Sequence, residues 1–492
     1  MRHVPGSSSG SDGAIPFCDM STARKHVIII GGGVSGLTSA YRLQQRGWNV
    51  TVLDAAHRVG GFLQSTSHPA GFRYEEGPLY FVDSPRIMAL IREVGLSTDL
   101  VTADLMLPRY VYHRHGLHLL PLTLRALLST RLISLGSKLR ALRAHPGKTA
   151  QRGHGDSVAE LVTWRFGRDV LRRIAAPVVA STHIGDVNRL SAELVCPDLL
   201  RHGQDTCSAL RSCIQSCHDS SSSGNGRRLC SFRKGLHELP RRLAERLGKE
   251  NVELGVQLKR IVPATEDGKN RFLLQLELID GERETQADAI VFAASAFRTA
   301  EMVEPFADKL AQELFSIEHP PLTVASLAYS REDIARATEG FGILVPEDQG
   351  IRMLACIWSS SIFPDRAPEG IVLMRVLLGG ARDTDIALAS DDKIVTVLKR
   401  DLKATLGIII APDVIGMQRY ERALPQYTLG HEHRVRRIEA EAARIPGMFL
   451  TGNYLRGFSI GACVHTAEET AEQVTAYLEK NSALPREPSA SQ

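Results

Sequence analysis

The sequence contains no uninterrupted run of 18 apolar residues, although 43% of its 492 residues are hydrophobic. A helix that crosses a bilayer needs about 20 such residues, so the sequence excludes a membrane-spanning helix. The 59 basic residues nearly balance the 55 acidic ones, and the net charge of +4 gives no reason to expect a nucleic-acid partner. No apolar core follows the basic residue near the start, which excludes a secretory signal. We expect residues 1–23 to form a disordered extension and residues 481–492 a disordered tail.

Cysteine pairs at metal-binding or redox spacing are also lacking. The eight cysteines show no regular framework and no C-x-x-C pair, which favours a reducing compartment and argues against a metal site. Three of them, Cys207, Cys213 and Cys217, lie in a serine-rich stretch that predicts a flexible loop over residues 201–230.

Acidic residues are absent between Asp104 and Asp156, an interval that holds nine lysines and arginines among leucine and isoleucine residues. One interpretation is a helical subdomain whose apolar face dips into an anionic membrane surface. The other is the ordinary solvated face of a basic helix pair, and we favour the membrane surface. Arg109, in the same interval, is also a candidate guide for an anionic substrate.

A glycine-rich turn near the start predicts a dinucleotide site. The apolar segment 27–30 is typical of a buried strand, and Gly31, Gly33 and Gly36 follow it in the pattern G-x-G-x-x-G, before a helix over 37–46. The first glycine permits the tight turn, the second lets backbone approach a pyrophosphate, and the third lets the helix pack close to the strand. The helix N-terminus favours the negative charge of the phosphates. Asp54, which follows a strand over 49–53, is placed to accept hydrogen bonds from a ribose.

The residues after this acid indicate a flavin rather than a nicotinamide. Asp54-Ala55-Ala56-His57-Arg58-Val59-Gly60-Gly61 resembles the acid and Arg-x-Gly-Gly pattern of the FAD-dependent amine oxidase and desaturase superfamily. Gly60 and Gly61 permit backbone to lie against the cofactor, and Arg58 supplies charge near its phosphates. Glu75-Glu76-Gly77-Pro78 resembles the superfamily's loop beneath the flavin ring. We therefore predict FAD as the cofactor.

A second glycine-containing turn near the end predicts that the cofactor domain is discontinuous. Residues 448–453 lead into this turn and then into a helix over 461–478, whose N-terminus we expect to stabilise negative charge on the reduced flavin. The predicted fold class is α/β (α+β overall): a discontinuous Rossmann-like FAD-binding domain, an inserted helical membrane-associating subdomain and a β-sheet-based substrate domain. The FAD-binding domain is expected to comprise residues 24–94, 231–297 and 440–480, with one strand over 252–261. The helical subdomain is expected at 95–200 and the substrate-binding domain at 298–439.

Several further segments resemble one family, the oxygen-dependent FAD-containing protoporphyrinogen oxidases, whose bacterial relatives include coproporphyrinogen oxidases. The resemblance extends over nearly the whole chain from residue 24, and its distinctive segments are 342–346, 359–364, 378–380, 425–431, 452–454, 457–460 and 463–464. The Pro-Gln-Tyr-x-x-Gly-His pattern of 425–431, with a downstream Gly-Asn turn, is far more specific than the glycine fingerprint. The resemblance implies the six-electron oxidation of protoporphyrinogen IX to protoporphyrin IX in haem biosynthesis, by hydride transfer to FAD and reoxidation by O2 with H2O2 release.

The resemblance also implies site residues. Arg109 aligns with an arginine that holds a substrate propionate, and a guanidinium suits a carboxylate because it donates two parallel bonds. Leu344, Ile357 and Leu377 fall where the family places apolar residues against the pyrrole rings; strand core is their alternative role. We expect no catalytic nucleophile or acid–base pair. Cofactor contacts are expected from Gly31, Gly32, Gly33, Val34, Ser35, Gly36, Asp54, Arg58, Gly60, Gly61, Phe62, Gly77, Pro78, Leu79, Tyr80, Leu258, Asn453, Phe458, Ser459 and Ile460.

One segment departs from the family pattern. At 181–186 the family is glycine-rich, whereas here Ser181 and Ile184 replace small flexible positions and His183 is added. We expect a narrower pocket there. His183 is a candidate substrate contact, but a loop histidine satisfied by local backbone is the interpretation that we favour.

Three alternatives stay open at this point. The first is coproporphyrinogen III as the substrate, and the second is a flavin amine oxidase or desaturase, although the usual paired aromatic residues beside the flavin are not found. The third is a non-enzymatic flavin-binding protein. The expected location is the cytoplasm or the cytoplasmic face of a membrane in a bacterium, and a mitochondrial or plastid membrane in a eukaryote; a homodimer is left open.

Overall fold

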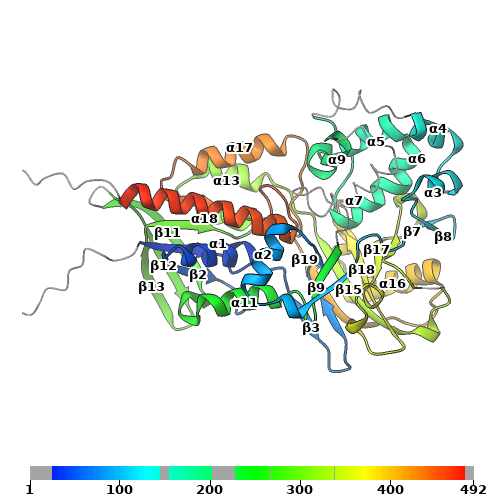
Figure 1. Ribbon diagram of the computed structural model, residues 1–492, viewed down its shortest axis with the longest axis horizontal. Coiled ribbons are helices and arrows are strands. Elements are labelled where there is room, and N and C mark those ends of the chain that lie inside the picture. Colours follow the sequence, from blue (N-terminus) through cyan, green and yellow to red (C-terminus); the bar gives the residue numbers. More distant parts are fainter. Residues whose placement is uncertain (1–24, 144–154, 202–227, 267–268, 337, 483–492) are drawn as a thin grey trace, which may run out of the picture.

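The computed structural model describes residues 25–143, 155–201, 228–266, 269–336 and 338–482. Two lobes lie side by side along its longest axis (Figure 1). The predicted extension at 1–23, the tail from 483 onward and most of the predicted loop at 201–230, with its three cysteines, lie outside the described residues.

A five-stranded sheet forms the centre of the first lobe, and all its strands are parallel. Its order is β10-β2-β1-β14-β20. These strands are β1 (His26–Ile30), β2 (Asn49–Asp54), β10 (Val252–Leu254), β14 (Ala289–Phe292) and β20 (Met448–Leu450). The sheet therefore joins segments from near both ends of the chain, as the two glycine turns predict.

Two layers cover this sheet. One face packs against the helices α1 (Val34–Gln45), α2 (Pro85–Glu93), α11 (Glu238–Leu247) and α18 (Ile460–Ser482). The other packs against an antiparallel sheet of β11 (Gln257–Glu266), β12 (Lys269–Leu278) and β13 (Gly281–Ala287), and against α12 (Ala296–Val303), α13 (Asp308–Phe315) and α17 (His431–Ala442). The last three helices lie mostly within residues 298–439, which we expected to belong wholly to the substrate-binding domain. Their apolar faces are instead buried against the five-stranded parallel sheet, called the FAD-type sheet below.

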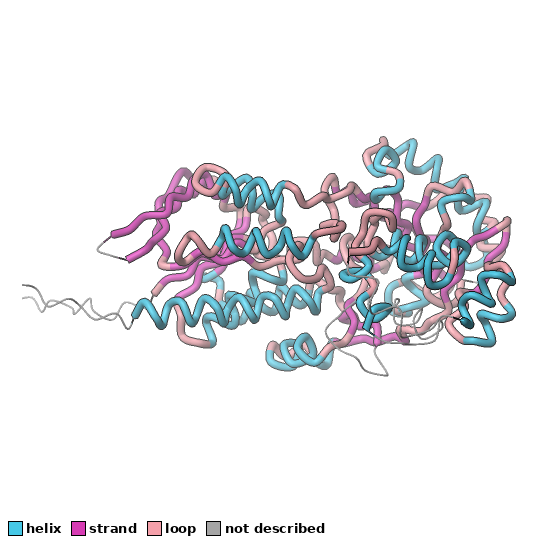
Figure 2. The backbone as a smooth tube through the Cα atoms, turned by 90° about the horizontal axis from the view of Figure 1, so that it is seen from above, coloured by secondary structure: helices cyan, strands magenta, loops and turns pink. Residues whose placement is uncertain are grey.

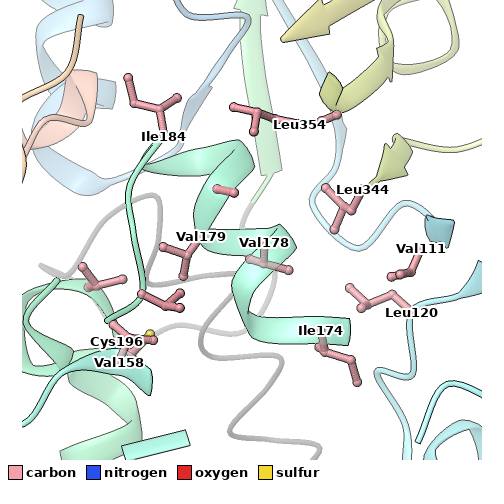
Figure 3. Packing of buried hydrophobic residues seen from close by; sticks show 14 of the residues in the cluster. Val111, Leu120, Val158, Ile174, Val178, Val179, Ile184, Cys196, Leu344 and Leu354 are labelled. Atoms are coloured by element: carbon pink, nitrogen blue, oxygen red, sulfur yellow. The ribbon is translucent and has the colours of Figure 1, made fainter. Parts of the chain in front are cut away.

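A seven-stranded sheet forms the second lobe, in the order β19-β15-β18-β17-β16-β7-β8. The strands are β7 (Arg109–His113), β8 (Gly116–Leu119), β15 (Leu322–Ser330), β16 (Gly342–Leu344), β17 (Met353–Trp358), β18 (Ile371–Gly379) and β19 (Asp413–Tyr420). One face is covered by α16 (Asp391–Leu406). The other shares an apolar core with α5 (Val158–Phe166) and α7 (Ala176–Thr182), and this core includes Val178, Val179 and Leu344 (Figure 3).

Two expectations about secondary structure are wrong. Residues 95–200 were expected to be helical, but β7, β8 and β6 (Leu100–Asp104) are strands, and β6 pairs with β9 (Arg228–Phe232), which also pairs with β5 (Phe81–Val82). The single strand expected over 252–261 is divided between β10 and β11. Gly255 has a φ of +70° between them, a left-handed conformation that ends the first strand.

The helical part of the second lobe lies at one end of the molecule (Figures 1 and 2). It contains α3 (Leu124–Ser129), α4 (Leu135–Arg143), α6 (Arg168–Val170), α8 (Ala192–Val195) and α9 (Pro197–Arg201) besides α5 and α7. Gly167, whose φ is +94°, separates α5 from α6. Among the described residues, none of the helices has the length and apolar content needed to cross a membrane. Short elements complete the fold: β3 (Ser65–Ser67), β4 (Arg73–Glu75), α14 (Ser359–Ile362) and α15 (Thr384–Ala387).

Candidate active site between the glycine turns and the seven-stranded sheet

The first glycine turn leaves the N-terminus of α1 open to an anion. Gly33 is the N-cap residue; no side chain caps the helix, and no acidic residue lies in its first turn. The first N–H groups of a helix need partners, and they carry the positive end of the helix dipole. This arrangement fits the pyrophosphate of a dinucleotide.

The three glycines of the pattern have different neighbours. A Cβ at Gly31 would lie 2.9 Å from the Ala293 carbonyl, and one at Gly36 would lie 1.9 Å from the Gly31 oxygen. A Cβ at Gly33 would have nothing within 4 Å. Protein packing therefore requires the first and third glycines, whereas the space at the second is left for a ligand. The residues present thus fit the phosphates of FAD.

The Asp54 carboxylate holds the backbone of the first glycine turn. Its two carboxylate oxygens accept hydrogen bonds from Gly32 N at 2.6 Å and from Ala56 N at 2.8 Å. Gly60 N donates to the Gly32 carbonyl at 2.8 Å, which brings the Arg-x-Gly-Gly segment against the turn. Arg58 donates to Gly61 O at 3.2 Å. The segment before Leu258 lies close by, because Val256 N donates to Asp54 O at 3.0 Å.

The C-terminal glycine turn lies against the first one. Cys463, in the first turn of α18, has a thiol hydrogen-bonded to Ser35 in the first turn of α1, and burial raises the pKa of that thiol to about 11. Ser39 Oγ donates to Ala467 O at 3.1 Å and joins the two helices further along. Ser459 caps α18 by accepting from Ala462 N at 3.1 Å. The N-terminal parts of α1 and α18 therefore lie side by side, and the expected contacts Asn453, Phe458 and Ile460 lie in or just before the start of α18.

The loop expected beneath the flavin is held by buried arginines. Arg375 donates to Glu75 O at 2.9 Å and to Gly77 O. Arg366 lies 3.0 Å from the Glu75 carboxylate and donates to Ser231 Oγ at 2.6 Å. Burial lowers the pKa of both guanidiniums and raises that of Glu75, an effect that the Arg366 charge opposes. Because arginine stays protonated in proteins, two positive charges lie beside one carboxylate here.

The expected substrate contacts lie on one face of the seven-stranded sheet. Register pairs Arg109 with Gly342, Gly342 with Ile357, and Ile357 with Arg375, so these four residues form one row across four strands. The row two residues further along contains Val111, Leu344, Ala355 and Leu377. Directly paired residues share a face, as do residues two apart along a strand. At a strand spacing of about 4.8 Å, the two arginines lie about 14 Å apart along the row.

Arg109 is more deeply buried than a residue at a pocket mouth would be. Its side chain is 4% exposed and donates to Leu105 O at 2.8 Å and to Leu107 O at 3.2 Å. Its guanidinium stacks over Phe341 at 4.2 Å, and Tyr80 packs edge-on against the same ring. The segment 75–80, called the flavin loop below, thus contacts the sheet in two places: directly at Arg375, and through Phe341 at Arg109.

The Pro-Gln-Tyr-x-x-Gly-His segment fastens the turn to the helical subdomain. Tyr427 donates to Asn453 O and stacks on His431, whose Nε2 donates to Tyr454 O at 2.9 Å. Gln426 donates to His183 O at 3.0 Å. The ring of His183 packs edge-on against Phe458, an expected flavin contact. The favoured interpretation, a loop histidine satisfied by local backbone, does not explain this position.

Sequence reasoning missed Arg375, Arg366 and Phe341. The signal for Arg375 was available, because a single arginine interrupts the otherwise apolar run Ile371–Gly379. Charged residues are seldom buried without partners, so such an arginine indicates a specific hydrogen-bonded role. No comparable local signal distinguishes Arg366 or Phe341.

Comparison with known proteins shows the family to which the chain belongs. A family model for flavin containing amine oxidoreductases matches residues 34–475, and the chain belongs to this family. The chloroplastic protoporphyrinogen oxidase of Nicotiana tabacum is 30% identical over 475 residues, which cover 92% of this chain and 86% of the relative. The coproporphyrinogen III oxidase of Bacillus subtilis is 26% identical, with 93% of this chain and 100% of the relative covered.

Solved structures show the same fold. A crystal structure from Exiguobacterium sp. 255-15, assigned provisionally as a protoporphyrinogen oxidase, superposes with a TM-score of 0.75 at 22% identity and covers 93% of this chain and 99% of that one. The cyclohexylamine oxidase of Brevibacterium oxydans gives a TM-score of 0.66 at 18% identity, with 93% and 100% covered. The chain is an FAD-dependent oxidase, which confirms the predicted cofactor and the enzyme class.

Proposed function

We propose that the protein oxidises protoporphyrinogen IX to protoporphyrin IX. The reaction would remove six electrons and six hydrogens in three two-electron steps, with one hydride per step passing to the flavin. Over the three steps, four hydrogens leave the meso carbons and two leave pyrrole nitrogens. Three molecules of O2 accept the electrons and protons and are released as H2O2. Bound FAD supplies the hydride acceptor, and the protein holds the macrocycle beside it.

The observation that carries the proposal is the sheet face with Arg109, Ile357, Leu344 and Leu377 in two adjacent rows. Apolar side chains in the same rows as a guanidinium suit a tetrapyrrole with carboxylate side chains, and all four residues are buried beneath the helical part of the second lobe. The flavin loop contacts both ends of this face, through Phe341 and through Arg375. The names of the tobacco and Bacillus relatives support a porphyrinogen as the substrate class.

Coproporphyrinogen III is the competing substrate, and it carries two more carboxylates. Both arginines of the row, Arg109 and Arg375, already donate to two backbone carbonyls each, so the row offers little further charge for two additional carboxylates, which favours the substrate with fewer of them. The test is anaerobic bleaching of the flavin absorbance by each porphyrinogen, followed by porphyrin fluorescence after O2 is admitted. We expect faster bleaching by protoporphyrinogen; faster bleaching by coproporphyrinogen would reverse the choice, and bleaching only by amines would reject both.

The proposal includes a membrane surface as a partner. In α4, Leu135 is 77% and Leu139 53% exposed, and Leu128 of α3 is exposed nearby. Exposed Arg125, Arg131 and Arg140 lie on the same two helices or between them. Exposed leucines among basic residues match a surface that inserts shallowly into anionic lipid. This supports a membrane-associating role for the helical subdomain.

The double substitution Leu135→Glu with Leu139→Glu tests this partner. We expect it to abolish co-sedimentation with vesicles that contain phosphatidylglycerol while the flavin spectrum stays unchanged. Ile279→Glu is the matched control, because Ile279 is 88% exposed on the β12–β13 turn of the other lobe. Equal binding of all three proteins, or equal binding to neutral vesicles, would contradict the proposal.

A further inference from the structure

The loop after α7 holds a buried histidine between the C-terminal glycine turn and the substrate-facing side of the sheet. His183 is 5% exposed, and its ring meets Phe458 at a centroid distance of 4.8 Å and an angle of 87°. The next residue, Ile184, belongs to the same apolar cluster as Leu344 and Leu377 and lies where the chain has left α7 (Figure 3). His183 therefore lies between an expected flavin contact and the expected substrate contacts.

The backbone of this loop is held in an unfavourable conformation. Ile184 has a φ of +51°, which is rare for a β-branched residue. Ile184 O accepts from Ala381 N at 2.7 Å, just beyond β18, and His183 O accepts from Gln426. Such conformations persist where the surroundings enforce them, and they cluster at functional sites.

Hydrogen bonds around the ring select its tautomer. Thr182 Oγ1 lies 2.8 Å from Val178 O and 2.9 Å from His183 Nδ1. A carbonyl can only accept and the hydroxyl has one hydrogen, so Nδ1 must donate if both contacts are hydrogen bonds. Nε2 then carries a lone pair, and no hydrogen bond within the described part of the chain goes to it. Burial lowers the pKa of His183 to about 3, which keeps the ring neutral.

Building on the proposed function, we propose that His183 Nε2 accepts a hydrogen bond from a pyrrole N–H of the bound porphyrinogen. A porphyrinogen offers four pyrrole N–H donors. The porphyrin product has two N–H groups and two imine-type nitrogens, which are themselves acceptors and cannot pair with the Nε2 lone pair. The contact therefore orients the macrocycle beside the flavin, and the oxidised product has half as many donors with which to make it.

A purely structural role makes a different prediction. If the ring only packs against Phe458, phenylalanine replaces it without loss, because His183→Phe keeps the aromatic edge and removes the acceptor. His183→Gln can place an amide acceptor near Nε2. Thr182→Val leaves the histidine in place but removes the partner of Nδ1, which frees the ring to carry its hydrogen on Nε2.

The experiment measures KM and kcat for protoporphyrinogen, FAD content, and porphyrin binding by fluorescence in the full-length holoenzymes. We expect His183→Phe to raise KM roughly 5- to 30-fold, as for loss of one buried hydrogen bond, with unchanged FAD content and a smaller loss of porphyrin binding. Thr182→Val should raise KM less, and His183→Gln should recover part of the loss.

The outcomes separate this proposal from the proposed function. A fully flavinated His183→Phe variant with the wild-type KM would overturn the role of His183. Should that variant fail to retain FAD, wild-type KM values in Thr182→Val would overturn it instead. A wild-type protein that turns over neither porphyrinogen would remove the proposed function and this inference together.

Discussion

A methyl group at Gly33 should separate cofactor binding from folding. The φ of Gly33 is −75° and its ψ is 178°, an extended conformation open to any residue, and an added Cβ would have no neighbour within 4 Å. The apoprotein should therefore tolerate Gly33→Ala. The methyl group would instead lie in front of the open N–H groups of α1, where the pyrophosphate must approach closely.

The magnitudes follow from these two environments. Replacing glycine by alanine at an N-cap costs at most about 1 kcal/mol, so the apoprotein should keep its Tm to within a few degrees. Loss of close contact with the helix N-terminus should cost FAD binding about 2 kcal/mol or more, roughly a 30-fold rise in Kd. Gly33→Val, with a larger side chain, should lose FAD altogether. The assays are thermal unfolding of the stripped protein and titration with FAD.

Gly36→Ala is the matched control. Its Cβ would lie 1.9 Å from the Gly31 oxygen, so this substitution should destabilise the fold with or without FAD. Wild-type FAD affinity in Gly33→Ala would show that the phosphates lie elsewhere. Loss of folding in Gly33→Ala would refute the claim that the space at this glycine belongs to the ligand.

Three further predictions concern buried charged and titratable side chains. Arg375→Leu should lower the stability of the holoenzyme by about 2–3 kcal/mol and speed FAD release, because it removes two charge-assisted bonds to the flavin loop; thermal unfolding and flavin fluorescence measure both. Arg109→Met keeps an apolar stem beneath Phe341 and should raise the KM for porphyrinogen with FAD content preserved, whereas an unchanged KM would remove Arg109 from the substrate site. Burial lowers the pKa of His183 to about 3 and of His431 to about 4, so between pH 6.5 and 4 the unfolded chain binds more protons, and stability is lost as pH falls. Each histidine should lower the free energy of unfolding by about 2 kcal/mol between pH 6.5 and pH 5. In Tm measurements over this range, His183→Phe should remove the contribution of His183 to the fall in stability.

The first glycine turn could be predicted from the sequence because everything that forms it is local. The strand, turn, helix and acid occupy residues 26–54, and each has its own pattern of apolar or glycine residues. The roles of the glycines also follow from backbone geometry alone. The C-terminal turn was predicted for the same reason, although only the structure brings Cys463 against Ser35.

The strands at 109–119 could not be predicted in the same way. β7 pairs with β16, more than 200 residues further along the chain, and nothing near Arg109 records that partner. The common face of Arg109, Ile357 and Leu377 depends on register across four strands, which no local pattern fixes. The resemblance to a family supplied these residues, whereas the physical reason for their proximity came from the sheet.

The FAD-type sheet contains strands from near both ends of the chain, and this has a consequence for folding during synthesis. The seven-stranded sheet needs nothing beyond Tyr420, so it can assemble while later residues are still inside the ribosome. Until residues 448–482 emerge, β14 has an unpaired edge and α1 lacks the helix that covers it. The candidate cofactor site is therefore incomplete until that segment emerges, and the apolar faces that it covers stay exposed during this interval.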